Sequence, residues 1–258
     1  MGNDQDIERR MKNLRTWNIV VGLILAVQAA VVAILTNAFA LPVTATFMSG
    51  PPGSPAVLNN LFDLSLGWGV FAFLAISALA LLIIASPWVF PWYKRNLLQN
   101  RNYGRWIEYF FSSSIMIVLI CQICGVSDIG ALVAIFGVNA AMILFGAVQE
   151  KYEKPGKNGS LLPFWMGCFP GIIPWIVIVI YVVAPGVTVS PPGFVYGIIA
   201  SLFIFFNTFA INMVLQYKQV GPWKDYLFGE KAYIVLSLTA KALLAWQVFA
   251  NVLVIELV

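Results

Sequence analysis

Seven long hydrophobic runs, separated by shorter polar segments, are the main pattern of the chain. A helix needs about 20 mainly apolar residues to cross the hydrocarbon core of a bilayer, and every run has about that length. The runs extend over Trp17 to Ala40, Leu61 to Ser86, Trp106 to Gly125, Ile129 to Val148, Leu161 to Ala184, Phe194 to Leu215 and Ala232 to Val258. The pattern predicts an all-α membrane protein built as a seven-transmembrane-helix bundle.

The connections between the runs leave little room for a second domain. Only Val126 to Asp128 separates the third run from the fourth, and Pro185, Pro191 and Pro192 punctuate the chain between the fifth and sixth. The longest connection covers about residues 41–60. We therefore predict one domain over residues 1–258, with a single long loop after the first helix.

The composition agrees with a membrane protein. Hydrophobic residues make up 60% of the chain and charged residues 10%, and the mean hydropathy is +0.86. Soluble domains have about 45 to 50% apolar and about 25% charged residues, so a soluble globule or a nucleic-acid-binding protein is excluded. We expect a multi-pass protein of the cell membrane, in contact with lipid.

The first run has one alternative interpretation. Basic residues precede it, and it ends in Ala38-Phe39-Ala40, which resembles the cleavage site of a signal peptide. The hydrophobic part of a signal peptide has about 7 to 15 residues. The first run is longer, so we expect it to remain as a helix.

The positions of the basic residues predict the orientation. Of the 15 Lys and Arg residues, 14 fall in the N-terminal segment and in every second connection, all on one side of the predicted bundle. They are Arg9, Arg10, Lys12, Arg15, Lys94, Arg95, Arg101, Arg105, Lys151, Lys154, Lys157, Lys218, Lys224 and Lys231. Because cytoplasmic loops carry the excess of Lys and Arg, we predict a cytoplasmic N-terminus, an extracellular C-terminus and an outer position for the 41–60 loop.

The remaining basic residue, Lys241, lies near the middle of the last run. A charge at the centre of a transmembrane helix is costly, usually faces the protein interior and marks a functional site. Desolvation favours the neutral amine, the nucleophilic form that condenses with an aldehyde. The alternative is a structural lysine bonded to backbone carbonyls or to a carboxylate.

Glu108 is the carboxylate best placed to face Lys241. Glu108 lies 17 residues before Gly125, and Lys241 lies 15 residues before Glu256. At about 1.5 Å per residue the two side chains are level within roughly 3 Å. The alternative is an interfacial Glu108 paired with Arg105 three residues earlier.

Other polar residues suggest a lined cavity between the helices. Ser112 and Met116 share the helix face of Glu108, and Ser237 precedes Lys241 by four residues. Amides also occur within the runs, and each has the alternative role of bonding neighbouring helices: Asn139, Asn207, Asn212, Gln216 and Gln247.

Residue counts argue against metal and redox chemistry. The chain has no histidine and three cysteines. Cys121 and Cys124 form a C-x-x-C spacing, but it lies inside an apolar run without a second pair. We expect no disulfide, no metal site and, because no pair of nucleophile and base is found, no enzyme.

The chain resembles the heliorhodopsins, the family of microbial rhodopsins with inverted topology. The resemblance rests on seven predicted helices, the cytoplasmic N-terminus, RWIEY at 105–109, the long first outer loop and, most specifically, SLTAKALLAWQVF at 237–249. It covers essentially the whole chain. One departure is the lack of histidines in the first two helices, which makes a histidine proton acceptor impossible here.

The resemblance implies all-trans retinal bound to Lys241 as a protonated Schiff base, with Glu108 as counterion. Ser112 and Ser237 match positions near the Schiff base. The implied pocket residues are Met116, Asn139, Ile143, Gly146, Trp165 and Phe206. The family also implies a homodimer, a slow photocycle and a sensory role with an unidentified cytoplasmic signalling partner.

Proton pumping is the first rival function. Pumps place functional groups on the third helix at spacings i, i+4 and i+11, which correspond here to Glu108, Ser112 and Leu119. Leu119 carries no proton, so the relay is incomplete and a light sensor is favoured over a transporter or channel. A seven-helix carrier that holds an anionic substrate at Lys241 without retinal is the second rival.

Overall fold

The computed structural model describes residues 2–156, 159–183 and 192–253. Seven of the described helices are long and apolar enough to cross a membrane, which confirms the seven predicted spans. They are α1 (Gly2–Leu35), α2 (Leu66–Ala85), α4 (Tyr103–Ile123), α5 (Ile129–Tyr152), α6 (Leu162–Val183), α7 (Gly193–Tyr217) and α8 (Tyr226–Val248). Some residues used in the sequence analysis lie outside the described residues. They are the predicted span ends Ala184 and Val258, and also Lys157, Pro185, Pro191 and Glu256.

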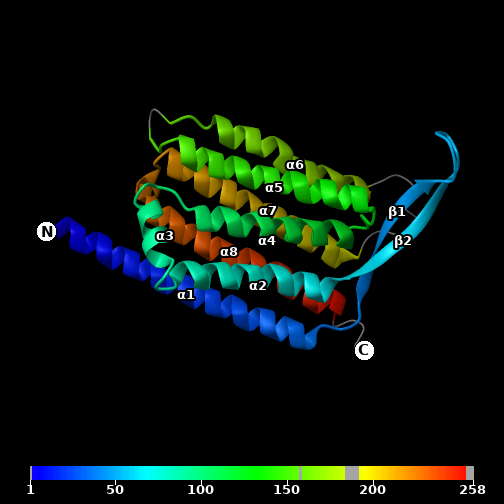
Figure 1. Ribbon diagram of the computed structural model, residues 1–258, viewed down its shortest axis with the longest axis horizontal. Coiled ribbons are helices and arrows are strands. Elements are labelled where there is room, and N and C mark those ends of the chain that lie inside the picture. Colours follow the sequence, from blue (N-terminus) through cyan, green and yellow to red (C-terminus); the bar gives the residue numbers. More distant parts are fainter. Residues whose placement is uncertain (1, 157–158, 184–191, 254–258) are drawn as a thin grey trace.

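The seven long helices run side by side as one bundle (Figure 1). In the bundle α1 packs against α2 and α8, α4 lies between α2 and α5, α5 contacts α6, and α7 contacts α8. The described chain also has three short helical segments: α3 (Phe90–Leu97), the 3-10 helix η1 (Gly221–Lys224) and the π-helix η2 (Phe249–Leu253). Helices α4 and α8 carry Glu108 and Lys241, and both side chains are buried between the helices.

A β-hairpin replaces the predicted outer loop, so the expectation of an all-α fold is wrong in this segment. Strands β1 (Ala40–Met48) and β2 (Ala56–Ser65) pair antiparallel and project from one end of the bundle (Figure 1). The turn contains Pro51 and Gly53, whose φ of 96° suits glycine. The backbone N–H of Thr44 donates to the carbonyl of Ser127 at 2.8 Å, which attaches the hairpin to the α4–α5 turn.

The hairpin also shortens the second predicted span. Residues 61–65 belong to β2, and α2 begins only at Leu66, with Ser65 as its N-cap. The Ser65 hydroxyl accepts from the backbone N–H of Trp68 at 3.4 Å. The apolar side chains of Leu61 and Phe62 made this end of the strand look like part of a helix, because hydropathy alone does not separate the two.

Helix α1 begins at Gly2, far before the predicted start at Trp17. Its first turns extend beyond the bundle (Figure 1), but Met11 and Leu14 are each only 1% exposed. Ion pairs from Arg10 to Asp225 and from Lys94 to Glu8 attach this extension to neighbouring segments. The basic N-terminal segment is therefore helical.

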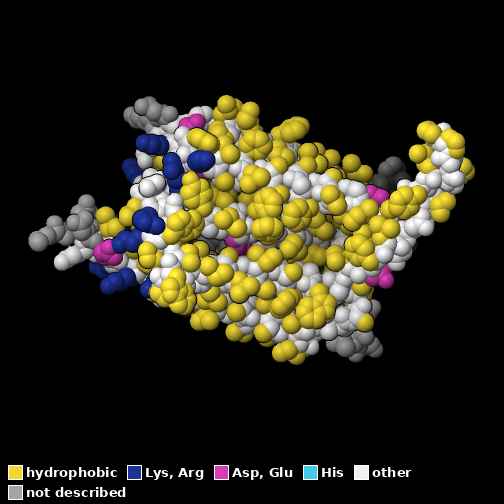
Figure 2. Space-filling view, in the orientation of Figure 1, with side chains coloured by type: hydrophobic (Ala, Val, Ile, Leu, Met, Phe, Trp, Pro, Cys, Tyr) yellow, Lys and Arg dark blue, Asp and Glu magenta, His cyan; other side chains and the backbone are white. Residues whose placement is uncertain are grey.

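Lys and Arg gather at the end of the bundle that carries the N-terminus, opposite the hairpin (Figure 2). This is the asymmetry expected from the loop charges. Which end faces the cytoplasm stays a prediction, because no membrane is part of the structure.

Candidate functional site

Lys241 and Glu108 meet in the centre of the bundle, as the depth count predicted. Lys241 Nζ lies 3.1 Å from Glu108 Oε1, and both side chains are at most 5% exposed. Lys241 Nζ also donates to the hydroxyl of Ser237 at 2.5 Å, one helical turn earlier on α8. It lies 5.0 Å from the ring centroid of Tyr109, a cation–π contact. The lysine therefore has a carboxylate, a hydroxyl and an aromatic face around it.

Two serines hold the carboxylate of Glu108 in place. The hydroxyls of Ser112 on α4 and Ser77 on α2 each donate to Oε1 at 2.5 Å. Lys241 contacts the same oxygen, so the described contacts leave Oε2 without a protein partner. The sequence predicted Ser112 but missed Ser77, because a single serine in an apolar run does not reveal which neighbour it faces.

An apolar cavity opens beside Lys241, between α4, α5, α6, α7 and α8. Its space amounts to about 850 Å³ when the opening to the surroundings is included. Six aromatic side chains contribute to its wall: Trp106, Tyr109, Phe164, Phe206, Phe209 and Tyr233. A buried amine facing a long aromatic cavity can attach an apolar aldehyde and shield it from water.

The structure brings most of the expected pocket residues to this cavity. Met116, Ile143, Gly146, Phe206 and Ser237 line it together with Lys241. A Cβ atom at Gly146 would lie 2.5 Å from Cη2 of Trp106, so the indole occupies the space that any other residue would need.

Three expected residues lie elsewhere. Ser112 contacts Glu108 outside the cavity wall, and Asn139 donates to the hydroxyls of Ser113 and Ser114 at 2.9 and 3.0 Å. Trp165 is 62% exposed on the outside of α6, and its neighbour Phe164 faces the cavity. A helix turns about 100° per residue, so an error of one position moves a side chain from the interior to the surface.

Other lining residues were missed by the sequence analysis. They are Trp106, Tyr109, Ser113, Met142, Phe164, Gly167, Cys168, Phe209, Ala210, Met213, Tyr233 and Ala240. Spacings of three, four and seven residues from Phe206 indicate Phe209, Ala210 and Met213 as residues of the same helix face. That signal was available but does not say which face of α7 is turned inward.

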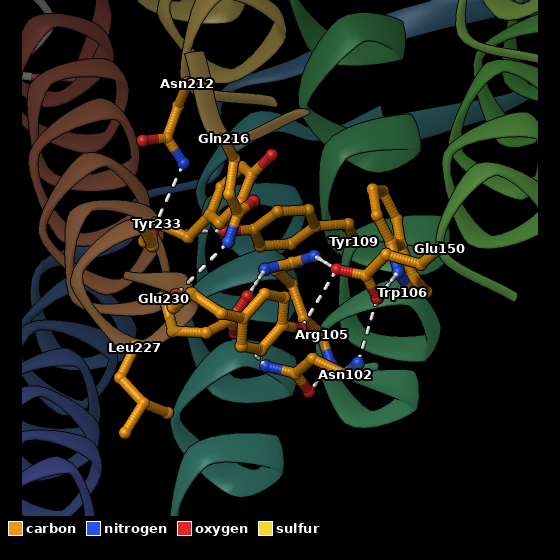
Figure 3. A network of polar contacts seen from close by, with 12 residues as sticks. Asn102, Arg105, Trp106, Tyr109, Glu150, Asn212, Gln216, Leu227, Glu230 and Tyr233 are labelled. Atoms are coloured by element: carbon orange, nitrogen blue, oxygen red, sulfur yellow. Dashed lines mark hydrogen bonds and ion pairs between the residues drawn. The ribbon is translucent and has the colours of Figure 1, made fainter. Parts of the chain in front are cut away.

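A buried charged cluster lies toward the basic end of the bundle (Figure 3). Arg105 is 6% exposed and forms ion pairs with Glu150 on α5 and Glu230 on α8. Its guanidinium carbon lies 3.9 Å from the ring centroid of Tyr233. The sequence analysis placed Arg105 in a loop and considered it as an alternative partner of Glu108. In the structure it pairs with Glu150 and Glu230 instead. We call Arg105, Glu150 and Glu230 the Arg105 cluster.

The Arg105 cluster was missed because its members lie at the ends of the hydrophobic runs. The predicted spans ended at Val148 and began at Ala232, so Glu150 and Glu230 were treated as connections. Helices α5 and α8 continue past these limits to Tyr152 and from Tyr226. Both glutamates are at most 4% exposed.

A second, smaller cavity lies between the Lys241–Glu108 pair and the Arg105 cluster. Its wall combines apolar side chains, Ala80, Leu81, Ile84 and Ile234 among them, with a polar group made of Asn18, Tyr93, Asn102, Arg105, Glu108 and Glu230. We call it the inner polar cavity after this second group. Tyr93, on α3, accepts weak hydrogen bonds from the side chains of Asn18 and Asn102. Burial raises the pKa of the Tyr93 hydroxyl, so this group keeps its proton at physiological pH.

Comparison with known proteins identifies one family. The model of the heliorhodopsin family matches residues 14–253, nearly the whole chain. A search of curated proteins gave no match.

Proposed function

Because the chain belongs to the heliorhodopsin family, a family of retinal-binding, light-sensing membrane proteins, we propose that it is a photoreceptor carrying all-trans retinal on Lys241. Glu108 is the counterion in this proposal. The observation that carries it is the position of Lys241 Nζ, 3.1 Å from Glu108 Oε1 and at the wall of an aromatic cavity.

The residues around Lys241 fit such a ligand. When bound, retinal supplies a conjugated chain that absorbs visible light and changes shape. The cavity wall is almost entirely apolar and aromatic, apart from Lys241, two serines and the tips of a few aromatic and cysteine side chains. These side chains exclude water and enclose an apolar ligand.

Glu108 stabilises positive charge at Nζ and is the nearest base for its proton. Ser77 and Ser112 donate to Oε1 at 2.5 Å, which fixes the orientation of the carboxylate. Movement of the proton from Nζ to Glu108 removes both charges of the pair. Loss of a buried ion pair is a local change that can shift the arrangement of α4 and α8.

A sensor is favoured over a transporter by the packing on the hairpin side of the pair. There the buried side chains of α2, α4 and α8 are largely apolar, and several are less than 2% exposed: Leu66, Val70, Phe73, Leu74, Leu119, Ile120, Leu244 and Val248. Buried carboxylates and the inner polar cavity lie on the opposite side. The described buried polar side chains toward the hairpin, Ser114, Gln122 and Asn139 among them, include no carboxylate. Among the described residues, a proton leaving Lys241 therefore finds a further buried carboxylate only toward the basic end.

The rest of the proposal follows from family membership. We propose a homodimer, a slow photocycle and a signalling partner on the basic, cytoplasmic end. The basic side chains at that end (Figure 2) would attract an acidic partner surface.

The first test is the visible absorption spectrum of the full chain purified with all-trans retinal. We expect a visible band that is absent in Lys241→Ala and present in the control Lys231→Ala, which lies on the same helix at the basic end. Circular dichroism checks that both variants are folded, and extraction of the ligand identifies its isomer. A missing band in the wild type would overturn the retinal proposal and favour a carrier.

A second measurement separates a sensor from a transporter. We expect no sustained photocurrent across a voltage-clamped membrane, because no further buried carboxylate lies on the hairpin side among the described residues. A sustained current that depends on the voltage would establish ion movement and contradict the sensory assignment.

A further inference from the structure

The inner polar cavity has room and partners for bound water. The space open to the centres of water molecules is about 30 Å³, and one water needs about 10 to 15 Å³ of such space. Asn18 Oδ1 and Arg105 Nε are buried and have no hydrogen-bond partner in the protein. One is an acceptor and the other a donor, a combination that water satisfies.

The cavity is lined by two carboxylates that belong to different ion pairs. Glu108 and Glu230 line it, together with Asn18 and Arg105. The described contacts of Glu108 all fall on Oε1, which leaves Oε2 available to water. Ser237, which accepts from Lys241, lines both this cavity and the larger apolar one. Bound water would therefore connect the Lys241–Glu108 pair with Glu230.

The Arg105 cluster contains one cation and two carboxylates. With both glutamates ionised, its net charge is −1 in surroundings that are at most 6% exposed. An uncompensated buried carboxylate has an increased affinity for a proton. The Lys241–Glu108 pair, in contrast, is neutral while both partners are charged.

The two glutamates of the cluster differ in their hydrogen bonds. Besides Arg105, Glu150 accepts from Trp106 Nε1, the backbone N–H of Asn102 and the Tyr226 hydroxyl. Glu230 accepts from Arg105 and from Asn102 Nδ2. Donors stabilise the ionised form of a carboxylate, and Glu150 has more of them than Glu230. Glu230 has fewer donors and is the one that lines the inner polar cavity.

We propose that Glu230 is the internal acceptor of the proton that leaves Lys241, reached from Glu108 through water in the inner polar cavity. This proposal rests on the proposed function. The N–H bond at Nζ breaks as an O–H bond forms on Glu108, and that proton then passes along the water to an oxygen of Glu230. After this transfer the Arg105 cluster is neutral and Glu108 is ionised again. The proton later returns to Nζ of Lys241 by the same route.

Other titratable groups near Glu230 do not compete for the proton. Tyr93 on α3, Tyr109 on α4, and Tyr226 and Tyr233 on α8 face it as phenols, which hold their protons near neutral pH. Arg105 is a permanent cation. Glu150 is the only other carboxylate among the described residues in this cluster.

Light-minus-dark infrared spectra test the assignment directly. When Lys241 loses its proton, we expect the C=O stretch of a protonated carboxylic acid to appear first from Glu108 and then from Glu230. Glu230→Gln should lose the second band, whereas the control Glu153→Gln, outside the cluster, should keep both. Glu150→Gln should keep the Glu230 band but shorten its lifetime. In this variant the positive charge of Arg105 balances an ionised Glu230, so Glu230 holds the proton less strongly.

A second readout does not need the bound ligand. In the dark, retinal-free full chain at neutral pH, the difference between wild type and Glu230→Gln should contain carboxylate stretches. A protonated-acid band there would overturn the proposal, because Glu230 would already hold a proton. An unchanged light-induced spectrum in Glu230→Gln would overturn it as well.

A cavity-filling variant covers the case in which Glu230→Gln does not fold. Ala80 lines the inner polar cavity, and Ala80→Leu would displace the water while leaving every carboxylate in place. We expect it to lose the Glu230 band and keep the Glu108 band; retention of both bands would contradict the water route. Absence of any pigment in the wild type, by contrast, would be a failure of the proposed function itself.

Discussion

The ion pair of Lys241 and Glu108 is a costly feature that the structure compensates locally. Two buried charges lose their hydration, and the loss is balanced only where geometry and further hydrogen bonds are good. Here Glu108 receives two serine hydroxyls, and Lys241 has Ser237 and the Tyr109 ring. Such concentration of partners is expected where a charge has a functional role.

Glu108→Gln tests the role of the carboxylate as counterion. Removing the negative charge beside Nζ favours the excited state, in which positive charge has moved away from the nitrogen, so the visible band should shift to the red. The pigment should also lose its proton at a lower pH than the wild type, because the cation at Nζ is no longer stabilised. Absorption spectra recorded over a pH series measure both effects.

The comparison for this variant is Glu153→Gln, which removes a carboxylate at the basic end of the bundle. Its spectrum should match that of the wild type. A blue shift in Glu108→Gln, or no shift at all, would show that another group neutralises the lysine.

Residue position within a hydrophobic run decided which charges could be predicted. Lys241 and Glu108 were recognised because they lie inside hydrophobic runs, where a charge is costly and usually marks a functional site. Arg105, Glu150 and Glu230 lie within about one helical turn of the run ends, where buried and loop charges have the same sequence pattern. Only the packing of α4, α5 and α8 shows that these three are buried.

At the scale of elements, hydropathy predicted the long helices and failed at the hairpin. A window of apolar residues does not distinguish a lipid-facing helix from a strand with exposed apolar side chains. Phe47, Leu58 and Phe62 are each at least 50% exposed on the hairpin. The turn at Pro51 and Gly53 was a local signal for a hairpin, but it lay inside a segment already assigned as a loop.

Asp128 connects the hairpin end of the bundle to the start of α5. Its side chain accepts from the backbone N–H of Ala131 at 2.9 Å, and its backbone forms a parallel bridge to Thr44. Asp128→Ala should lower the free energy of unfolding by about 1 kcal/mol, the usual cost of losing an N-cap. Thermal unfolding of the pigment in detergent measures the change.

The matched variant is Asp128→Asn, which keeps a capping oxygen and should stay close to the wild type in stability. Asp63→Ala removes an acidic residue from the exposed part of β2 and should have little effect. If Asp128→Asn destabilised the protein as much as Asp128→Ala, the charge rather than the cap would be the stabilising feature.

At the scale of the whole molecule, the bundle has two unlike halves. Basic side chains, the Arg105 cluster and the inner polar cavity lie toward the end that carries the N-terminus. The half toward the hairpin has a mainly aliphatic interior. In the proposed photoreceptor, light absorbed by retinal on Lys241 would therefore change hydrogen bonding in the basic half, on the side where we propose a signalling partner.

The orientation of these halves in the membrane is the prediction on which that assignment depends. Asn59 on β2 and Lys218 at the end of α7 are both exposed and lie at opposite ends of the bundle. In a background with Cys121, Cys124 and Cys168 replaced by alanine, Asn59→Cys should react with a membrane-impermeant maleimide in intact cells. Lys218→Cys should react only after permeabilisation, because an excess of Lys and Arg keeps its end of the bundle in the cytoplasm. The opposite labelling pattern would place the Arg105 cluster toward the outside, and the light-induced change would then be directed away from any cytoplasmic partner.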